Sequence, residues 1–234
     1  MAGLRDLLSS PRYEVIPAKG TEQAVAEWVP AGMTVTVTAS PVKGLDPTIE
    51  LTEKLASRGY RVVPHLAARS VTSDAHLDDI VARLTACGVD DVFVPGGDAT
   101  HPAGPFHGAL PLLERLDEKG RPFGRIRARG VTLPLYVGLA APVERSRLLR
   151  MAAVAGAAES ARFITRHPGW ILRFWAPGGY HPDRFLDRAA TVITAPDAGV
   201  AGLHLFTFNQ LQPAEQWRRA ALERTGNEKP LLAG

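Results

Sequence analysis

The sequence predicts a mixed α/β protein built on parallel strands. Short runs of β-branched residues alternate along its 234 residues with stretches of helical spacing, and corners rich in Gly and Pro separate them. Strands that alternate with helices are joined by right-handed crossovers, which make neighbouring strands parallel. The pattern is that of an open doubly wound sheet or of a closed barrel, and the length suits one domain spanning residues 1–234.

The first part of the chain holds three predicted strands. Their runs read "YEVIP", "MTVTVTAS" and "YRVVPHLAA". Pro47 suits the first turn of the helix between the second and third runs, and Gly59 suits its end. In order, the expected elements are strand 13–17, helix 22–28, strand 33–40, helix 47–58 and strand 60–68.

The best-patterned helix follows the third strand. Asp74 is expected to cap its N-terminus, and Gly88 is expected to end it. Its apolar residues recur at helical spacing and predict one buried stripe, made of Leu77, Ile80, Val81, Leu84 and Cys87. We therefore expect Cys87 to be an ordinary core residue.

Three further strands are expected beyond this helix. "DDVFVPGGD" predicts a fourth strand with its loop, and "VTLPLYVGLA" and "AGLHLFTFN" predict two more. The helices expected here are 107–120, 142–156 and 213–224. Six strands are thus countable, whereas a closed barrel of this class needs eight.

Composition limits the possible functions. Hydrophobic residues make up 45% of the chain and charged residues 22%, so a substantial core is expected. The net charge is +3 and the arginines are scattered, which argues against a nucleic-acid surface. The single cysteine excludes an internal disulfide, and the histidines show no metal-ligand spacing, so no metal site is expected. Without a signal-peptide pattern or a long apolar run, we expect a cytoplasmic protein that does not enter a membrane.

Polar residues stand at the ends of several predicted strands. In a parallel barrel the chemistry gathers at the carboxyl ends of the strands. The residues at these positions are Glu14, Thr38, Ser40, His65, Asp98, Asn209 and Gln210. Each has an ordinary interpretation as well: His65 as a hydrogen-bonded structural residue, Thr38 as a strand residue, and Asp98 as a turn former or helix cap.

Glu14 is the least ordinary of these residues, because it interrupts an apolar strand. A carboxylate buried there costs several kcal/mol unless it is paired, hydrogen-bonded or protonated. Burial would favour the protonated carboxyl, which can act as a general acid near neutral pH. The alternative is an ion pair with one of the many arginines, and the spacing of residues leaves both interpretations open.

Taken in order, these motifs resemble those of the methylenetetrahydrofolate reductase family. "YEVIPAKG" resembles the family's Glu-containing first strand, "VTVTAS" its second and "VVPHLAAR" its Pro-His-Leu strand. "VFVPGGD" resembles its strand ending in Gly-Asp, "LPLYVGLAAP" its late Pro-Gly strand, and "GLHLFTFN" its closing Thr-x-Asn strand. Each pattern is loose, and their collinear order over most of the chain is what makes the resemblance specific.

The resemblance implies a (β/α)8 TIM barrel that reduces 5,10-methylenetetrahydrofolate to 5-methyltetrahydrofolate with NADH or NADPH as the hydride donor. Glu14 matches the acid that assists opening of the imidazolidine ring, and Asp98 matches the aspartate that faces the pterin. Thr38 and His65 match positions that line the cofactor side of the barrel mouth. The remaining residues expected to bind substrate or cofactor are Gly97, Asn209 and Gln210.

The chain departs from the family pattern in two ways. Gly96 stands where most members carry an Arg that contacts the phosphates of FAD, so we expect direct hydride transfer without a tightly held flavin. The alternatives are an FAD-dependent reductase and a non-catalytic folate-binding barrel. The family's fifth- and sixth-strand motifs are missing, and "FGRI" runs straight into "RARG", so we expect about two βα units to be absent near residues 126–127. The only expected partner is the folate substrate, and a monomer and a small homo-oligomer both fit.

Overall fold

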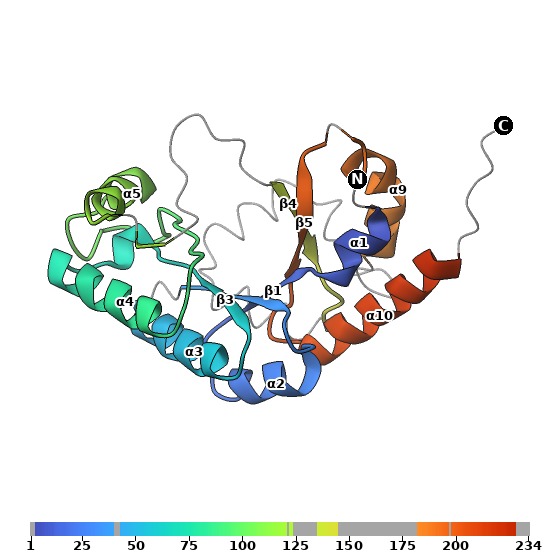
Figure 1. Ribbon diagram of the computed structural model, residues 1–234, viewed down its shortest axis with the longest axis horizontal. Helices are drawn as coiled ribbons and strands as arrows, with labels where there is room; N and C mark the ends of the chain where they lie inside the picture. The colour runs from blue at the N-terminus through green and yellow to red at the C-terminus, as the bar shows by residue number, and fades with distance from the viewer. Residues whose placement is uncertain are drawn as a thin grey trace. The chain divides into compact units, whose positions relative to one another are not determined.

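A computed structural model describes residues 3–39, 43–120, 122–123, 135–144, 182–196 and 198–227. It divides into two compact units. Figure 1 draws their helices and strands. The first, Arg12–Leu133, is called the amino-terminal unit below. The second combines Met1–Pro11 with Pro134–Gly234 and is called the carboxy-terminal unit. Each unit is described by itself.

The amino-terminal unit contains three parallel strands with β2 in the middle. They pair in register, so that Tyr13 lies opposite Val35 and Val35 opposite Val62. The strands are β1 (Arg12–Val15), β2 (Thr34–Val37) and β3 (Arg61–Pro64). The helices are α2 (Thr21–Trp28), α3 (Asp46–Ser57), the short 3-10 helix η1 (Ala68–Ser70), α4 (Asp74–Ala86) and α5 (Ala109–Glu118).

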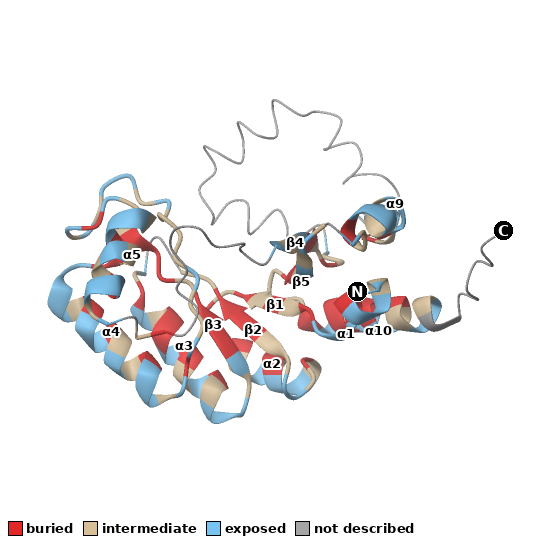
Figure 2. Cartoon of the chain, turned by 45° about the horizontal axis from the view of Figure 1, so that its top comes forward, coloured by how far each residue is buried: buried red, intermediate tan, exposed pale blue. Residues whose placement is uncertain are grey.

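The two faces of β1 differ in character. Tyr13 and Val15 are fully buried, whereas Glu14 between them is half-buried. Successive side chains in a strand point to opposite faces, so the apolar run "YEVI" places its acid away from the buried face. Helix α3 packs against β2 and β3. In Figure 2 the helices α3 and α4 are buried toward the strands and exposed on the outside.

One hydrophobic core joins the helices α3, α4 and α5. Cys87, expected in this core, is partly buried and packs against its edge. The core residues are Leu45, Ile49, Leu66, Ala67, Ala68, Val71, Leu77, Ile80, Leu84, Val89, Phe106, Leu112, Leu116 and Phe123. The N-cap of α4 is Ser73 and not the expected Asp74, because Ser73 has extended backbone and its side chain accepts from the His76 N–H at 3.1 Å.

The predicted fourth strand is wrong as a regular element. The segment holds a single parallel bridge, between Phe93 and His65. Further along, Pro95 and Gly96 accept hydrogen bonds from the N–H groups of Ala68 and Arg69, at 2.9 and 3.0 Å. Pro95 has no backbone N–H to donate, so it cannot form the second hydrogen bond that regular strand pairing requires. The segment therefore lies beside the chain that follows β3 without becoming a strand.

The carboxy-terminal unit contains two parallel strands, β4 and β5. Helix α1, which the sequence pattern did not predict, packs against α10 and β5. Glu215 on α10 is 1% exposed, accepts two hydrogen bonds from Arg218, and Arg218 donates to the Leu8 carbonyl of α1. The elements are α1 (Leu4–Ser9), β4 (Leu135–Ala140), α9 (Asp183–Ile193), β5 (Val200–Phe206) and α10 (Leu211–Asn227).

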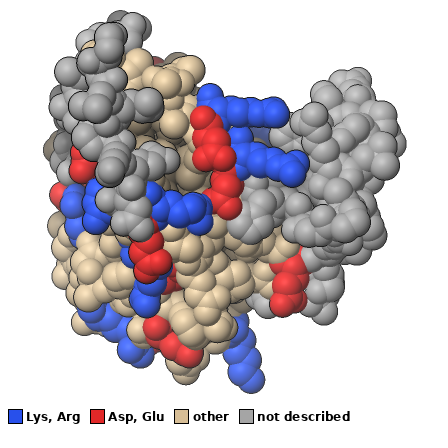
Figure 3. Space-filling model, turned by 90° about the vertical axis from the view of Figure 1, so that its right-hand side faces the viewer, with Lys and Arg blue, Asp and Glu red and all other residues tan. Residues whose placement is uncertain are grey.

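Figure 3 shows acidic and basic side chains interspersed on the face that it draws.

The structure confirms the mixed α/β class with parallel strands and alternating helices. Five strands lie within the described ranges. The eight-stranded barrel and the single domain stay predictions. Ser40, the junction 126–127 and most of the expected helix 142–156 lie outside the described residues. Within the part of the chain that is described, no helix is long and apolar enough to cross a membrane.

Candidate functional site

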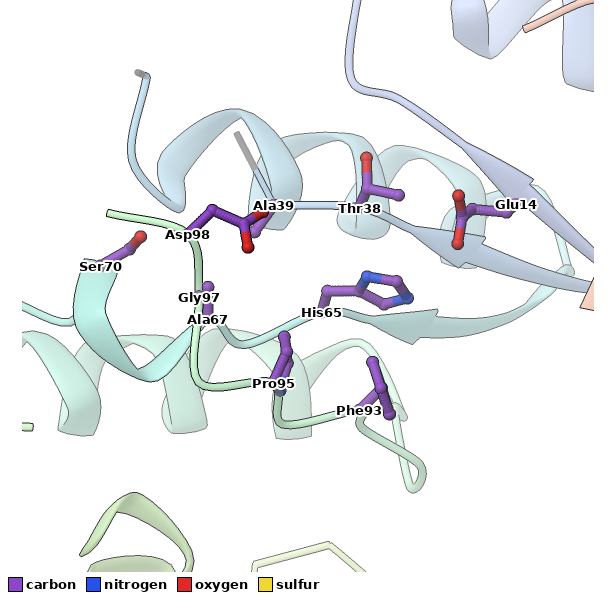
Figure 4. Close-up of a pocket in the computed structure, with 10 residues that line it drawn as sticks. All are labelled: Glu14, Thr38, Ala39, His65, Ala67, Ser70, Phe93, Pro95, Gly97 and Asp98. Carbon is purple, nitrogen blue, oxygen red and sulfur yellow. The ribbon is translucent and has the colours of Figure 1, made fainter. Parts of the chain in front are cut away.

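Five of the seven predicted site residues line one pocket in the amino-terminal unit. The pocket has a volume of about 270 Å³ and opens at the carboxyl ends of the strands (Figure 4). Its lining residues are Glu14, Thr38, Ala39, His65, Ala67, Ser70, Phe93, Pro95, Gly97 and Asp98. Residues far apart in the sequence thus meet at the position where parallel α/β proteins carry their chemistry.

Strand register explains why Glu14, Thr38 and His65 meet. Glu14 lies opposite Thr36, and Thr38 is two residues further along the same strand direction. His65 follows Pro64, which lies opposite Val37, so His65 occupies the same level as Thr38. Since the side-chain period of a strand is two, all three residues project from one face of the sheet.

Backbone and side-chain hydrogen bonds fix these positions. The Thr38 N–H donates to the Val15 carbonyl at 2.9 Å, and the His65 N–H donates to the Val37 carbonyl at 2.8 Å. The Thr48 hydroxyl, in the first turn of α3, donates to the Thr38 carbonyl at 2.8 Å. The ordered pairing of β1, β2 and β3 therefore continues into the residues that line the pocket.

The loop that carries Gly97 and Asp98 is held by Arg69. The guanidinium of Arg69 donates to the carbonyls of Ala99 and His107, at 3.1 and 3.0 Å. Gly97 has φ of +91°, and a Cβ there would lie 3.2 Å from the Cβ of Ala67. Both the backbone conformation and the close approach favour glycine at this position. Asp98 follows at an exposed position on the pocket wall.

The pocket combines two carboxylates with an imidazole. Glu14 is half-buried and Asp98 is exposed, and in Figure 4 the His65 ring extends toward the side of the pocket that holds Glu14. Among the described residues that line the pocket, none is Lys or Arg. Such a site can donate or accept protons, and its charge favours neutral or cationic ligands over anions.

Asn209 and Gln210 belong to the carboxy-terminal unit, at the end of β5, and do not line this pocket. Asn209 has φ of +57° in the turn before α10, and its N–H donates to the Thr207 hydroxyl at 3.2 Å. The side-chain oxygen of Gln210 accepts from the Glu144 N–H, just after β4, at 2.7 Å. Both residues therefore stabilise the carboxyl ends of β4 and β5.

Three residues near the site were missed by sequence reasoning: Arg69, Ser70 and Phe93. The sequence predicts Phe93 within a strand but does not indicate which face of the sheet it lies on. Its bridge to His65 places it on the polar face, and a single bridge leaves no pattern in the sequence that would reveal this. Ser70 and Arg69 lie in the short 3-10 helix after β3, which has no periodic signature.

No protein-family model matches the chain. Within the described ranges there is no group of three or more His, Cys, Asp or Glu residues that could hold a metal ion.

Proposed function

We propose that the chain is a reductase that transfers a hydride from NADH or NADPH to 5,10-methylenetetrahydrofolate, giving 5-methyltetrahydrofolate. The observation that carries this proposal is the pocket that brings together Glu14, Thr38, His65, Gly97 and Asp98. Glu14, Thr38, His65 and Asp98 are also positions at which this chain resembles the motifs of the methylenetetrahydrofolate reductase family. The collinear motifs and the shared pocket support the same reaction.

The pocket offers the groups that this reaction needs. A protonated Glu14 gives its proton to a nitrogen of the imidazolidine ring, and the bond between that nitrogen and the methylene carbon breaks. The other ring nitrogen shares its electron pair to form a cationic iminium. The iminium accepts the hydride at carbon, so the donor is oxidised and the folate is reduced. Asp98 favours the positive charge that develops during ring opening.

Direct hydride transfer without a tightly held flavin is the version we favour. The position before Gly97 is Gly96, which has no side chain to contact a diphosphate. Arg69, which flanks the same loop, already donates to two backbone carbonyls. We further propose that the strands belong to an eight-stranded barrel and that the protein is cytoplasmic.

The test is anaerobic turnover of NADH and NADPH with 5,10-methylenetetrahydrofolate, in which 5-methyltetrahydrofolate is quantified by mass spectrometry. Glu14→Gln should lower kcat by about 10²–10⁴-fold, the usual contribution of a general acid. Glu50→Gln is the matched control, because Glu50 is an exposed carboxylate on α3 and does not line the pocket. Equal turnover by the two variants would refute the assigned role of Glu14.

Two further outcomes distinguish the alternatives. A stoichiometric flavin band in the visible absorption spectrum of the purified protein would contradict direct transfer and favour an FAD-dependent reductase. Folate binding without any nicotinamide-dependent product would favour a non-catalytic folate-binding protein, and in that case Glu14→Gln would leave folate binding unchanged.

A further inference from the structure

Phe93 is a large apolar side chain that stands exposed on the wall of a polar pocket. It is 53% exposed, although aromatic rings normally contribute to cores by burial. The other residues of the pocket include two carboxylates, an imidazole and two hydroxyls. Among the described residues that line the pocket, Phe93 is the largest apolar side chain, and Ala39, Ala67 and Pro95 supply further apolar surface.

The backbone fixes the side on which the Phe93 ring lies. Its N–H donates to the Pro64 carbonyl at 3.1 Å, and its carbonyl accepts from the Leu66 N–H at 2.8 Å. These two bonds form the parallel bridge to His65. The ring centroids of Phe93 and His65 are 4.8 Å apart, with their planes at 63°. The two rings form a corner in which a flat ring can stack on one and meet the other at an angle.

We propose that Phe93 is the stacking surface for a flat, conjugated, nitrogen-containing ring that carries no negative charge. A flat ring gains contact with an exposed aromatic face that a puckered ring of equal size does not. N–H groups on its edge suit the carboxylate of Asp98 as an acceptor. The volume of about 270 Å³ suits a ring system better than a whole dinucleotide.

This inference rests on the proposed function for the identity of the ring, which is the pterin of the folate or the nicotinamide of the hydride donor. The two share one chemistry, a flat conjugated ring with N–H donors at its edge: the pyrimidine half of the reduced pterin, or the dihydropyridine of the donor with its carboxamide. The stacking itself is measured by binding and does not require turnover.

The experiment titrates the full chain with 6-methylpterin, with nicotinamide and with cyclohexanecarboxamide, and follows binding by ligand-observed NMR and calorimetry. Cyclohexanecarboxamide carries the amide of nicotinamide on a ring that is not flat. We expect at least one flat ring to bind more tightly than cyclohexanecarboxamide. If substitution of Phe93 weakens the binding of 6-methylpterin alone, the ring that stacks on Phe93 is that of the substrate. If it weakens the binding of nicotinamide alone, the ring is that of the hydride donor.

Three variants locate the effect. Phe93→Leu keeps an apolar side chain without an aromatic face and should weaken binding of the flat ring by about three- to tenfold. Phe93→Tyr keeps the ring and should restore the wild-type Kd within about twofold. Phe185→Leu is the control, since Phe185 is an exposed aromatic residue on α9 that does not line the pocket. Circular dichroism confirms that each variant is folded.

The inference is overturned if neither flat ring binds the wild-type chain, if cyclohexanecarboxamide binds equally well, or if folded Phe93→Leu keeps the wild-type Kd. Ring binding that depends on Phe93, in a chain that forms no 5-methyltetrahydrofolate, would support the stacking surface and refute the reductase. Turnover to 5-methyltetrahydrofolate with KM values unchanged in Phe93→Leu would support the reductase and refute the stacking surface.

Discussion

Gly104 is the residue at which a single added methyl group should disturb the loop that carries Asp98. A Cβ on Gly104 would lie 2.3 Å from the carbonyl oxygen of Thr72 and 2.5 Å from that of Val71. Ordinary contacts of a Cβ begin near 3.4 Å, so the loop must move by about 1 Å in Gly104→Ala. Both neighbours are backbone atoms and cannot turn aside as a flexible side chain does.

The cost follows from the hydrogen bonds that this movement strains. The Ala103 N–H donates to the Arg69 carbonyl at 2.8 Å, and the Arg69 guanidinium donates to Ala99 and His107. At about 1 kcal/mol for the neutral bond and about 1.5 for each charged one, the loss of all three bonds costs about 4 kcal/mol. The lower entropy of the unfolded alanine chain offsets about 0.4–1 kcal/mol of this. We expect a net loss of about 3 kcal/mol.

The assay is urea unfolding, with Gly108→Ala as the control. Gly108 caps α5 in extended backbone, and a Cβ there meets nothing within 4 Å. Its substitution should cost less than about 1 kcal/mol. If Gly104→Ala unfolds at the same urea concentration as Gly108→Ala, the packing of this loop on residues 71–72 is not what holds it.

Two further predictions concern ionisable groups outside the pocket. Arg83 donates to both carboxylate oxygens of Glu53 at 2.8 Å, and these bonds lower the pKa of Glu53 from its ordinary value of 4.5. The pair therefore stabilises the fold fully above pH 4.5, and this stabilisation is lost as the pH falls through the lowered pKa. Glu53→Gln should therefore cost about 0.5 kcal/mol in urea unfolding at pH 7 and less at pH 3, and an equal cost at both would contradict the linkage. Burial raises the pKa of the Cys87 thiol, so less of it is the reactive thiolate at pH 7. Iodoacetamide should therefore alkylate Cys87 more slowly than it alkylates free glutathione, as followed by mass spectrometry of the intact protein. A faster reaction of Cys87 would contradict this.

Most elements with a long periodic signature could be predicted from the sequence, although α9 was not. The helices α3, α4, α5 and α10 and the strands β1 to β5 lie where apolar periodicity and Gly or Pro corners put them. Helix α1 has six residues, too few for a periodic pattern, and it is held by tertiary packing against α10. The fourth predicted strand failed because β propensity does not decide whether a partner supplies a ladder.

The site could be predicted in part for a similar reason. Glu14, Thr38, His65, Gly97 and Asp98 stand at strand ends, and the parallel order of strands brings strand ends together. The contributions of Arg69 and Phe93 depend on one bridge and on hydrogen bonds to backbone carbonyls, which sequence spacing does not encode. Asn209 and Gln210 also follow a strand, but the Asn209 N–H bonds within the turn before α10, and the Gln210 side chain bonds to the chain after β4.

The register of β1 also changes how its acid should be understood. Glu14 was expected to lie within a buried strand, where it would need a partner or a proton to offset the cost. The burial of Tyr13 and Val15 with Glu14 half-buried between them shows that only one face of β1 belongs to the core. A shift of one residue in the pairing with β2 would exchange the two faces and bury the carboxylate. The register that keeps Glu14 out of the core therefore also keeps it on the same face as Thr38 and His65. The functional hypothesis for Glu14 thus depends on these neighbours in the pocket and not on burial.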